Sequence, residues 1–155
     1  MFEGIGESFL EIIFRRILDK HGIKYIPPNI VKGVDFVLFN EIAFIELEDT
    51  VSEVYHAINQ LIEKAAGIAS IYRGFIVIAI PMLEEPERII SPLQRFFYKT
   101  RKFNVRREFW LFEENRIIKI IASGAKPSPF LEEISEVIEV RVKAKGEIPI
   151  DEKLR

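Results

Sequence analysis

The stretch GVDFVLFNEIAFIELED, residues 33–49, decides how the rest of the chain is organised. It holds two short apolar runs, residues 34–39 and 42–47, on either side of the turn-like pair Asn40 and Glu41. Apolar runs around a short turn are typical of a β-hairpin whose strands are buried. We therefore expect a tight hairpin at the centre of the protein.

The acidic residues of this hairpin carry its chemistry. Asp35 lies near the start of the first strand, and Glu46 and Glu48 lie two residues apart at the end of the second, on one face of the pleat. A carboxylate in an apolar strand costs free energy unless its charge is compensated. Three of them at one end of a hairpin predict a divalent cation. In the other interpretation, Glu46, Glu48 and Asp49 are only the polar end of a strand that leaves the core.

The composition bounds the class of protein. The chain has 155 residues, of which 48% are hydrophobic and 30% charged, as expected for one globular domain. We expect this domain at residues 1–145 and a charged, flexible tail at residues 146–155. No apolar run is long enough to cross a bilayer, and the N-terminus has no basic region before an apolar one. We therefore expect a soluble, cytoplasmic protein without a membrane partner.

Charge and cysteine content limit the possible sites. Cysteine is absent, so a metal ion would be held by oxygen ligands or by the two histidines. The formal net charge of -2 gives no overall attraction to nucleic acid, and any such attraction has to be local. Many Ile, Glu, Lys and Arg residues and few Met residues resemble the composition of proteins from thermophiles.

The hydrophobic periodicity predicts an α/β fold, with a mixed central β-sheet flanked by helices. The run FIVIAI is apolar at every position, which suits a strand covered on both faces. We expect helices over residues 6–20, 50–72, 91–100 and 130–136, and further strands over residues 23–26, 75–80, 105–112, 116–122 and 137–143.

Two of these helices bring polar residues towards the hairpin. Glu11 lies between Leu10 and Ile12, which favours an inward orientation, whereas Glu7 is explained at least as well by the positive end of the helix dipole. In the long helix, polar residues recur at every fourth position and form a ridge. Its members are His56, Gln60 and Lys64. A solvated helix face is the alternative explanation of this ridge.

The order helix, strand, hairpin, long helix, apolar strand, with acids at Glu11, Asp35 and Glu46, resembles the PD-(D/E)XK nuclease superfamily, and within it the archaeal Holliday junction resolvases. The resemblance covers the first half of the chain, to about Ile80. It implies a restriction-endonuclease-like fold and a hydrolase in which Glu11, Asp35 and Glu46 bind Mg²⁺ or Mn²⁺. The cation would polarise the scissile phosphate and the attacking water.

Glu48 departs from this family pattern, since the family has a lysine two residues after the second acid. Three explanations stay open. Lys64 can reach back into the site as the catalytic cation; Gln60, four residues before it, matches a glutamine of the RecB-related members, whose tyrosine is Lys64 here. Glu48 can itself be a ligand or the base. Or the site is a relic, and the fold is kept for binding.

A segment rich in basic and aromatic residues, QRFFYKTRKFNVRR at 94–107, contains no acid. Basic residues neutralise phosphates, and exposed aromatic rings stack on unpaired bases. We expect it to bind nucleic acid, although a solvated face with acidic partners elsewhere is an alternative. The candidate contacts are Arg95, Lys99, Arg101, Lys102, Arg106 and Arg107.

Together these features predict a metal-dependent nuclease, or a nuclease-derived protein, that acts on DNA. The alternative is a catalytically inactive module of the same fold that binds nucleic acid or a protein partner. A general structural role also stays open, because fold does not fix function. The apolar strand near residues 137–142 can lie at a sheet edge and pair with a second copy, which predicts a homodimer.

Overall fold

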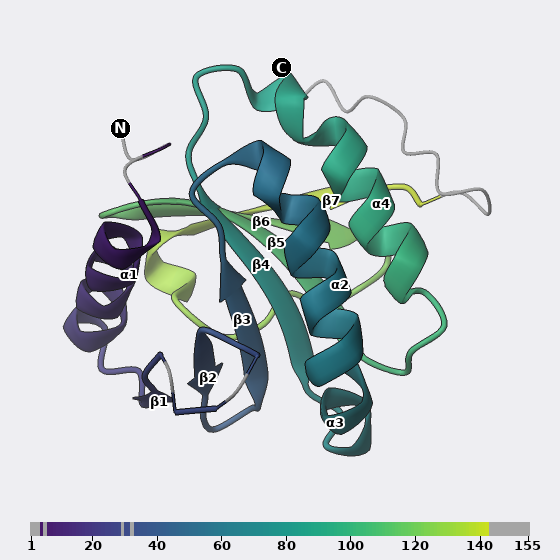
Figure 1. The fold of residues 1–155 in the computed structure, drawn as a ribbon, viewed down its shortest axis with the longest axis horizontal. Coiled ribbons are helices and arrows are strands. Elements are labelled where there is room, and N and C mark those ends of the chain that lie inside the picture. Colours follow the sequence, from purple (N-terminus) through teal and green to yellow (C-terminus); the bar gives the residue numbers. More distant parts are fainter. Residues whose placement is uncertain (1–3, 5, 29, 32, 143–155) are drawn as a thin grey trace.

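The protein is built around one seven-stranded mixed sheet, seen in a computed structural model that describes residues 4, 6–28, 30–31 and 33–142 (Figure 1). The strands lie in the sheet in chain order. Three pairs of neighbours are parallel, β3 with β4, β4 with β5 and β6 with β7, and the other three are antiparallel. The strands are β1 (Tyr25–Ile26), β2 (Phe36–Leu38), β3 (Ala43–Leu47), β4 (Phe75–Pro81), β5 (Arg106–Glu113), β6 (Arg116–Ala122) and β7 (Ser135–Val140).

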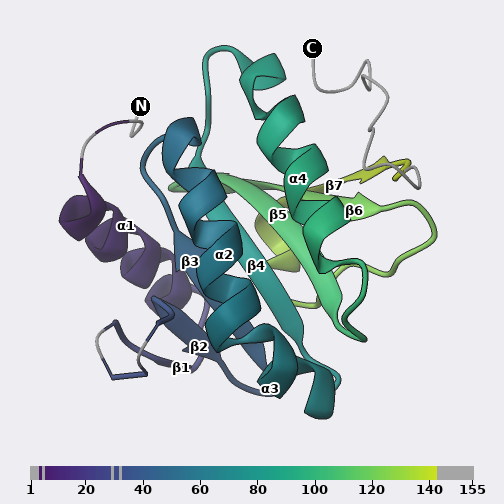
Figure 2. The same ribbon diagram turned by 45° about the vertical axis from the view of Figure 1, so that its right-hand side comes forward.

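Helices cover both faces of this sheet, which confirms the α/β class (Figures 1 and 2). One face packs against α1 (Glu7–Lys20), and the other packs against α2 (Val54–Lys64), α3 (Ala66–Ile71) and α4 (Ile90–Thr100). Among the described residues, no helix is long and apolar enough to cross a bilayer.

The alternation of side chains along the central strands separates the two cores. In β4, Ile76 and Ile78 belong to the core under α2 and α4, whereas Phe75 and Val77 belong to the core under α1. All seven residues of β4 are buried, as its uninterrupted apolar sequence predicts. In β3 the same alternation turns Glu46, which is paired with Ile78, towards α2.

The central hairpin is present, but its turn is longer than predicted. The strands pair from Leu38 and Ala43 outwards, which leaves residues 39–42 in the turn, with Asn40 at a φ of 83°. Asp35 and Glu48 consequently flank β2 and β3. Both still bond to the sheet, since the N–H of Asp35 donates to Ile45 O (3.0 Å) and the N–H of Glu48 donates to Ala79 O (3.1 Å).

Two predicted helices differ from the structure. The long helix starts with a 3₁₀ turn, Val51–Glu53, and divides at Ala65 into α2 and α3. The change of direction keeps small buried residues, among them Ala65, Ala66 and Ala69, against the sheet. The helix predicted at residues 130–136 is only a 3₁₀ turn, Glu132–Ile134.

The reason for the second difference lies in the residues on either side of that turn. Leu131 has a φ of 57°, which is incompatible with a right-handed helix, and its carbonyl oxygen accepts a hydrogen bond from Ser135 Oγ (2.6 Å). Pairing with β6 starts at Ser135, two residues before the predicted strand. The end of that predicted strand, Lys143, and the tail at residues 146–155 lie outside the described residues.

A buried polar cluster ties β5 and β6 to the loop that follows β6. Glu108, only 1% exposed, accepts hydrogen bonds from Trp110 Nε1 (2.8 Å) and from the hydroxyl (2.7 Å) and backbone N–H of Ser128. Lys119, also 1% exposed, donates to the carbonyl oxygens of Ser128 and Phe130. Because these charged groups have polar partners, the cluster holds the loop in place.

We expect Glu108→Ala to lower the free energy of unfolding by about 3–5 kcal/mol, because it leaves buried donors unpaired and removes the negative charge that compensates Lys119. Urea denaturation followed by circular dichroism measures this change. The control, Glu139→Ala on the exposed side of β7, should stay within about 0.5 kcal/mol of wild type. A loss at Glu108 no larger than that of the control would show that the cluster contributes nothing.

Candidate functional site

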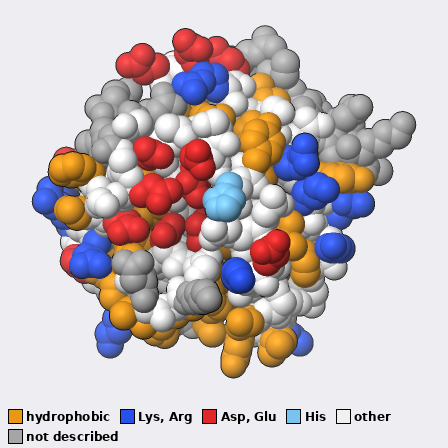
Figure 3. Space-filling model, viewed as in Figure 1, with side chains coloured by type: hydrophobic (Ala, Val, Ile, Leu, Met, Phe, Trp, Pro, Cys, Tyr) orange, Lys and Arg blue, Asp and Glu red, His pale blue; other side chains and the backbone are white. Residues whose placement is uncertain are grey.

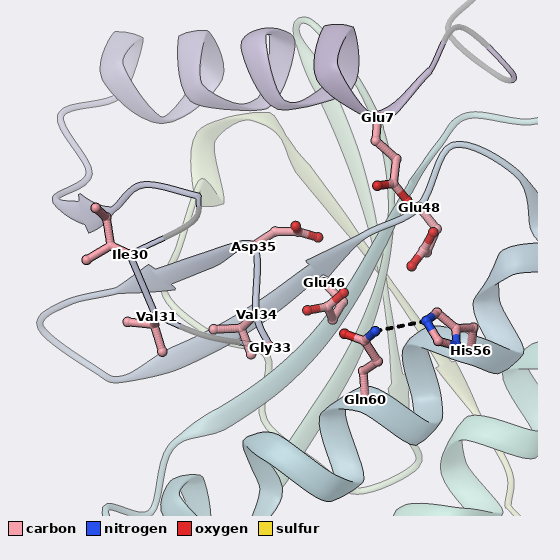
Figure 4. A pocket seen from close by; sticks show the side chains of 10 residues that line it. All are labelled: Glu7, Ile30, Val31, Gly33, Val34, Asp35, Glu46, Glu48, His56 and Gln60. Carbon is pink, nitrogen blue, oxygen red and sulfur yellow. Dashed lines mark hydrogen bonds between the residues drawn. The ribbon is translucent and has the colours of Figure 1, made fainter.

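A pocket of about 550 Å³ opens between the start of α1, the central hairpin and α2 (Figure 4). Four carboxylates and two other polar side chains face it, and a largely apolar lip borders it. The acids come from two strand ends and from the first turn of a helix, so only the tertiary fold brings them together. The lining residues are Glu7, Asp35, Glu46, Glu48, His56 and Gln60, with Ile30, Val31, Gly33 and Val34 at the lip.

The hairpin positions two of these acids. Asp35 Oδ2 accepts a hydrogen bond from the backbone N–H of Leu47 at 2.7 Å, which fixes the carboxylate across the hairpin. Glu46, one residue earlier in β3, turns to the same face, and both side chains line the pocket (Figure 4). The structure therefore brings Asp35 and Glu46 together in one pocket, and their sharing of a cation stays a prediction.

The other two acids form a second pair. Glu48 follows β3 and is buried, with 4% of its surface exposed, and its side chain lies beside that of Glu7 (Figure 4). Glu7 begins α1, whose preceding residue Gly6 donates its N–H to Asp49 Oδ2 (3.1 Å). This contact ties the start of the helix to the end of β3. Glu48 thus belongs to the pocket, as one of the explanations for the missing lysine requires.

Burial raises the pKa of Asp35 to about 6, that of Glu46 to about 9 and that of Glu48 to about 10. The hydrogen bond from Leu47 lowers the pKa of Asp35 against this effect, whereas the negative charge of Asp35 raises the pKa of Glu46 further. At Glu48 the second cause, after burial, is the neighbouring carboxyl group of Glu7. In the absence of a cation, some of these carboxyl groups therefore keep their protons at neutral pH.

Glu7, rather than Glu11, is the helical acid that lines the pocket. Glu11 is half-buried one turn further on, where burial raises its pKa, and its charge still raises the pKa of Asp35. The sequence analysis missed Glu7 because the helix dipole explains an acid in the first turn equally well. The spacing of four residues between Glu7 and Glu11 was the available signal, since it places both on one helix face.

The polar ridge of α2 faces the acids over only part of its length. His56 and Gln60 line the pocket and contact each other, with 2.8 Å between His56 Nε2 and Gln60 Nε2. Lys64, one turn further, is exposed and lies outside the pocket lining. Its aliphatic stem packs on Gly33, where an added Cβ would lie 2.5 Å from Lys64 Cγ. Among the described residues, no lysine or arginine lines this pocket.

The donor set suits a hard divalent cation, although its members lie apart as two pairs. Carboxylate oxygens are the ligands that Mg²⁺ and Mn²⁺ prefer. In the part of the chain that the structure describes, no three Asp, Glu or His side chains converge closely enough to form a ready-made metal site. A cation between the pairs would compensate the negative charge that burial otherwise makes costly. The predicted metal ligands Glu11, Asp35 and Glu46 stay predictions.

Basic side chains gather over α4, on the face of the molecule that also shows the acidic pocket (Figure 3). Arg95 and Lys99 are exposed on α4, and the guanidinium of Arg95 lies 5.5 Å from the ring centre of Tyr55 in α2. Lys102 is exposed just after the helix. These three residues leave their charges accessible to a ligand.

The other three basic residues of the segment are engaged by the protein. Arg107 is half-buried and donates to Phe97 O (2.8 Å), and Arg101 donates to Tyr98 O (2.6 Å). Arg106 lies at the start of β5, at the end of the sheet away from the acidic pocket. The predicted nucleic-acid contacts therefore form two sets. The residues of one set are accessible on α4 and just after it, and those of the other donate hydrogen bonds to backbone carbonyl oxygens.

The raised pKa values predict how stability depends on pH without metal. A carboxyl group whose folded-state pKa is raised binds more protons in the folded than in the unfolded state, so stability falls as pH rises from about 4.5 to about 9 at Glu46. Glu46→Gln removes this loss. At pH 8 we expect the variant to be more stable than wild type by at least about 1 kcal/mol, with little difference at pH 5.

Urea denaturation at both pH values in EDTA measures this effect. Glu139→Gln, an exposed substitution with the same change of charge, is the matched control and should show no such pH dependence. If Glu46→Gln were destabilising at pH 8 and pH 5 alike, the side chain would contribute by packing rather than through its charge.

Comparison with known proteins leaves the site to be interpreted from its own geometry. No family model, no curated protein and no solved structure matches this chain.

Proposed function

We propose that this chain is a divalent-cation-dependent nuclease, or a protein derived from one, of restriction-endonuclease-like fold that acts on DNA. The observation that carries the proposal is a pocket lined together by Asp35 and Glu46, from the two strands of the hairpin, and by Glu48. The order of the elements supports it, since a helix, three strands, a helix and a parallel strand surround the acids as the family resemblance implies.

The basic surface on α4 supports a polyanionic substrate. Arg95 and Lys99 lie one turn apart on an exposed face next to the pocket, where they can bind successive phosphates of a nucleic acid. Because the acids would repel a bare phosphate, binding at the pocket itself requires a cation. The two surfaces together suit a phosphodiester that is held on α4 and reaches the acids.

Each polar residue of the pocket then has a role. Asp35 and Glu46 hold the cation, with Glu48 and Glu7 as further ligands on the opposite side. A bound Mg²⁺ or Mn²⁺ would polarise the scissile phosphate and acidify the attacking water. Glu48, whose pKa is raised by burial, is placed to exchange a proton with a water molecule in the pocket. His56 and Gln60 can donate hydrogen bonds to a phosphate oxygen from the side of α2.

Lys64 is the candidate for the positive charge that the family pattern has in place of Glu48. Its stem lies against Gly33 at the pocket lip, and its long side chain is exposed and unbranched. A rotation about the side-chain bonds would bring its ammonium group to the mouth of the pocket.

The rival function is a catalytically inactive module of the same fold that binds nucleic acid or a protein. The pocket supports this rival in one respect, because among the described residues no basic side chain stands where the family pattern has its lysine. Binding without cleavage is the result that it requires.

Incubation with labelled single-stranded, duplex and branched DNA in Mg²⁺ or Mn²⁺ tests the proposal. We expect cleavage by the wild type and a loss of about 100-fold or more in Asp35→Ala, because the charge that holds the cation is removed. Glu139→Ala is the control and should cleave normally. Lys64→Met, tested in parallel, shows whether the relocated lysine contributes.

DNA binding without any cleavage by the wild type would contradict the nuclease and support the module. Cleavage that persists unchanged in Asp35→Ala would place the activity outside this pocket or in a contaminant.

We also propose that the protein forms a homodimer through β7. This strand lies at one edge of the sheet, and Val137 on it is 40% exposed. An unpaired edge strand offers backbone N–H and C=O groups to a second copy. Light scattering after size exclusion should give twice the 18.1 kDa of the chain, and Val137→Lys should shift the protein towards monomer. A monomeric wild type would contradict this proposal.

A further inference from the structure

A second pocket, of about 460 Å³, is lined by residues from the turn between α3 and β4 and from the start of β5. Figure 2 shows that α3 and the start of β4 lie at the end of the sheet opposite the carboxyl end of β3. The chemistry of its lining is the reverse of that of the first pocket, because it contains two arginines, an amide and an aromatic ring but no acid. The lining residues are Arg73, Phe103, Asn104, Val105 and Arg106.

Arg106 is held rigidly at this pocket. Its guanidinium lies 4.1 Å from the ring centre of Phe75, donates to Arg73 O at 3.0 Å and forms an ion pair of 3.5 Å with Glu41 Oε2. Glu41 therefore offsets the charge of Arg106. The net positive charge of the pocket has to come from other residues.

Arg73 supplies that charge. It lies in the turn between α3 and β4 with a φ of 54°, a left-handed conformation that is uncommon for a residue with a side chain. The turn is held by hydrogen bonds from Arg73 N to Ser70 O (3.2 Å) and from Gly74 N to Ala69 O (2.8 Å). The side chain of Arg73 is exposed, and no carboxylate among the described residues pairs with its guanidinium. Its charge is available to an anion.

The rest of the lining suits a base rather than a phosphate. The ring of Phe103 is partly exposed, with Lys102 Nζ 5.4 Å from its centre. Asn104 is exposed and presents both hydrogen-bond donors and an acceptor. Tyr72, next to Arg73, is 63% exposed. An arginine, an amide and an aromatic ring around one cavity can together bind the phosphate, the base edge and the base face of one nucleotide.

The exposed face of α4 connects this pocket with the acids. It carries Arg95 at the end near Tyr55, then Lys99, and it is followed by Lys102. In the sheet, Glu46 of β3 pairs with Ile78 of β4, which in turn pairs with Phe109 of β5. Arg106, at the second pocket, lies three residues before Phe109 in β5. Three residues along a strand and two strand spacings across the sheet separate Arg106 from Glu46 by about 14 Å in a straight line. About four stacked nucleotides cover that distance, and the path over α4 is longer.

We propose that the pocket at Arg73 and Phe103 binds one nucleotide of a single strand of nucleic acid, whose backbone continues along α4 towards the acidic pocket. This inference rests on the proposed function and specifies its substrate: a strand with unpaired bases, anchored at a fixed distance from the acids. Duplex DNA lacks the exposed base faces that Phe103 would contact.

Fluorescence anisotropy with labelled single strands of three and of twelve nucleotides, in EDTA and with the full chain, tests this inference. Oligodeoxythymidine and oligouridine probes are used in parallel. We expect Arg73→Glu to weaken binding of the 12-mer at least tenfold and Phe103→Ala to weaken it several-fold. The 3-mer, which can fill this pocket but is too short to follow α4, should bind wild type more weakly than the 12-mer does, and Arg73→Glu should weaken its binding as well.

The matched control is Lys126→Glu, which makes the same change of charge at an exposed residue of the loop after β6. It should bind the 12-mer within about twofold of wild type. Thermal melting of each variant, followed by circular dichroism, verifies that it is folded. In Arg73→Ala the slope of log affinity against log salt should fall by about 0.7, the value for one lost phosphate contact on a single strand.

A 12-mer that binds Arg73→Glu as tightly as wild type, or that does not bind wild type, overturns the inference. If cleavage depends on Asp35 while Arg73→Glu changes nothing, only the second pocket is refuted and the nuclease stands. If binding depends on Arg73 but no DNA is cleaved, the second pocket stands and the nuclease is refuted.

Discussion

The hydrogen bond from the backbone of Leu47 to the carboxylate of Asp35 is the contact on which the site depends. It fixes an acid against the neighbouring strand at a position where the pleat turns Glu46 to the same side. Glu46 is then only 5% exposed, and Asp35 is half-buried beside it. Burial of these two carboxyl groups costs folding free energy, and apolar residues at the same positions would not have this cost.

The buried charged cluster at Glu108 and Lys119, in the same sheet, differs from these acids in its hydrogen-bond partners, and this difference is why we assign the acids a ligand-binding role. Glu108 and Lys119 are as deeply buried as Glu46, but each has several hydrogen-bond partners that belong to the protein. Such a cluster stabilises a loop and needs no ligand. Glu46 and Glu48 have other acids as neighbours, which raises their pKa values instead of satisfying their charges. A cation bound from solution would compensate the negative charge of these carboxylates.

The fold also separates charge along the strands, which a net charge of -2 conceals. The carboxyl end of β3 carries the acids, and the amino end of β5 carries Arg106 with Arg73 beside it. Between the two ends, α4 exposes Arg95 and Lys99. A flexible polyanion would be attracted to the arginines at the amino end of β5 and would need a bound cation at the carboxyl end of β3. This separation of charge is the basis of the proposed substrate, a strand anchored at a distance from the acids.

The departures from the sequence predictions have local causes. The hydrophobic period of the long helix continues through Ala65, so no period analysis would show the break there. The helix predicted after Phe130 fails because Leu131 adopts a left-handed conformation, which apolar spacing does not encode. The sequence predicted β4 and β7 correctly as strands. Burial on both faces gives β4 its uninterrupted apolar pattern, and burial on one face gives β7 its alternating pattern.

What the sequence alone determined is the α/β class, the central hairpin and the meeting of Asp35 with Glu46, since all three follow from the periods of strands and helices over short distances. Only the tertiary structure decided that Glu7 rather than Glu11 lines the pocket, and that Lys64 packs on Gly33 outside it. Those choices depend on the angle at which each helix crosses the sheet. That angle is set by packing between distant residues, which no local pattern in the chain records.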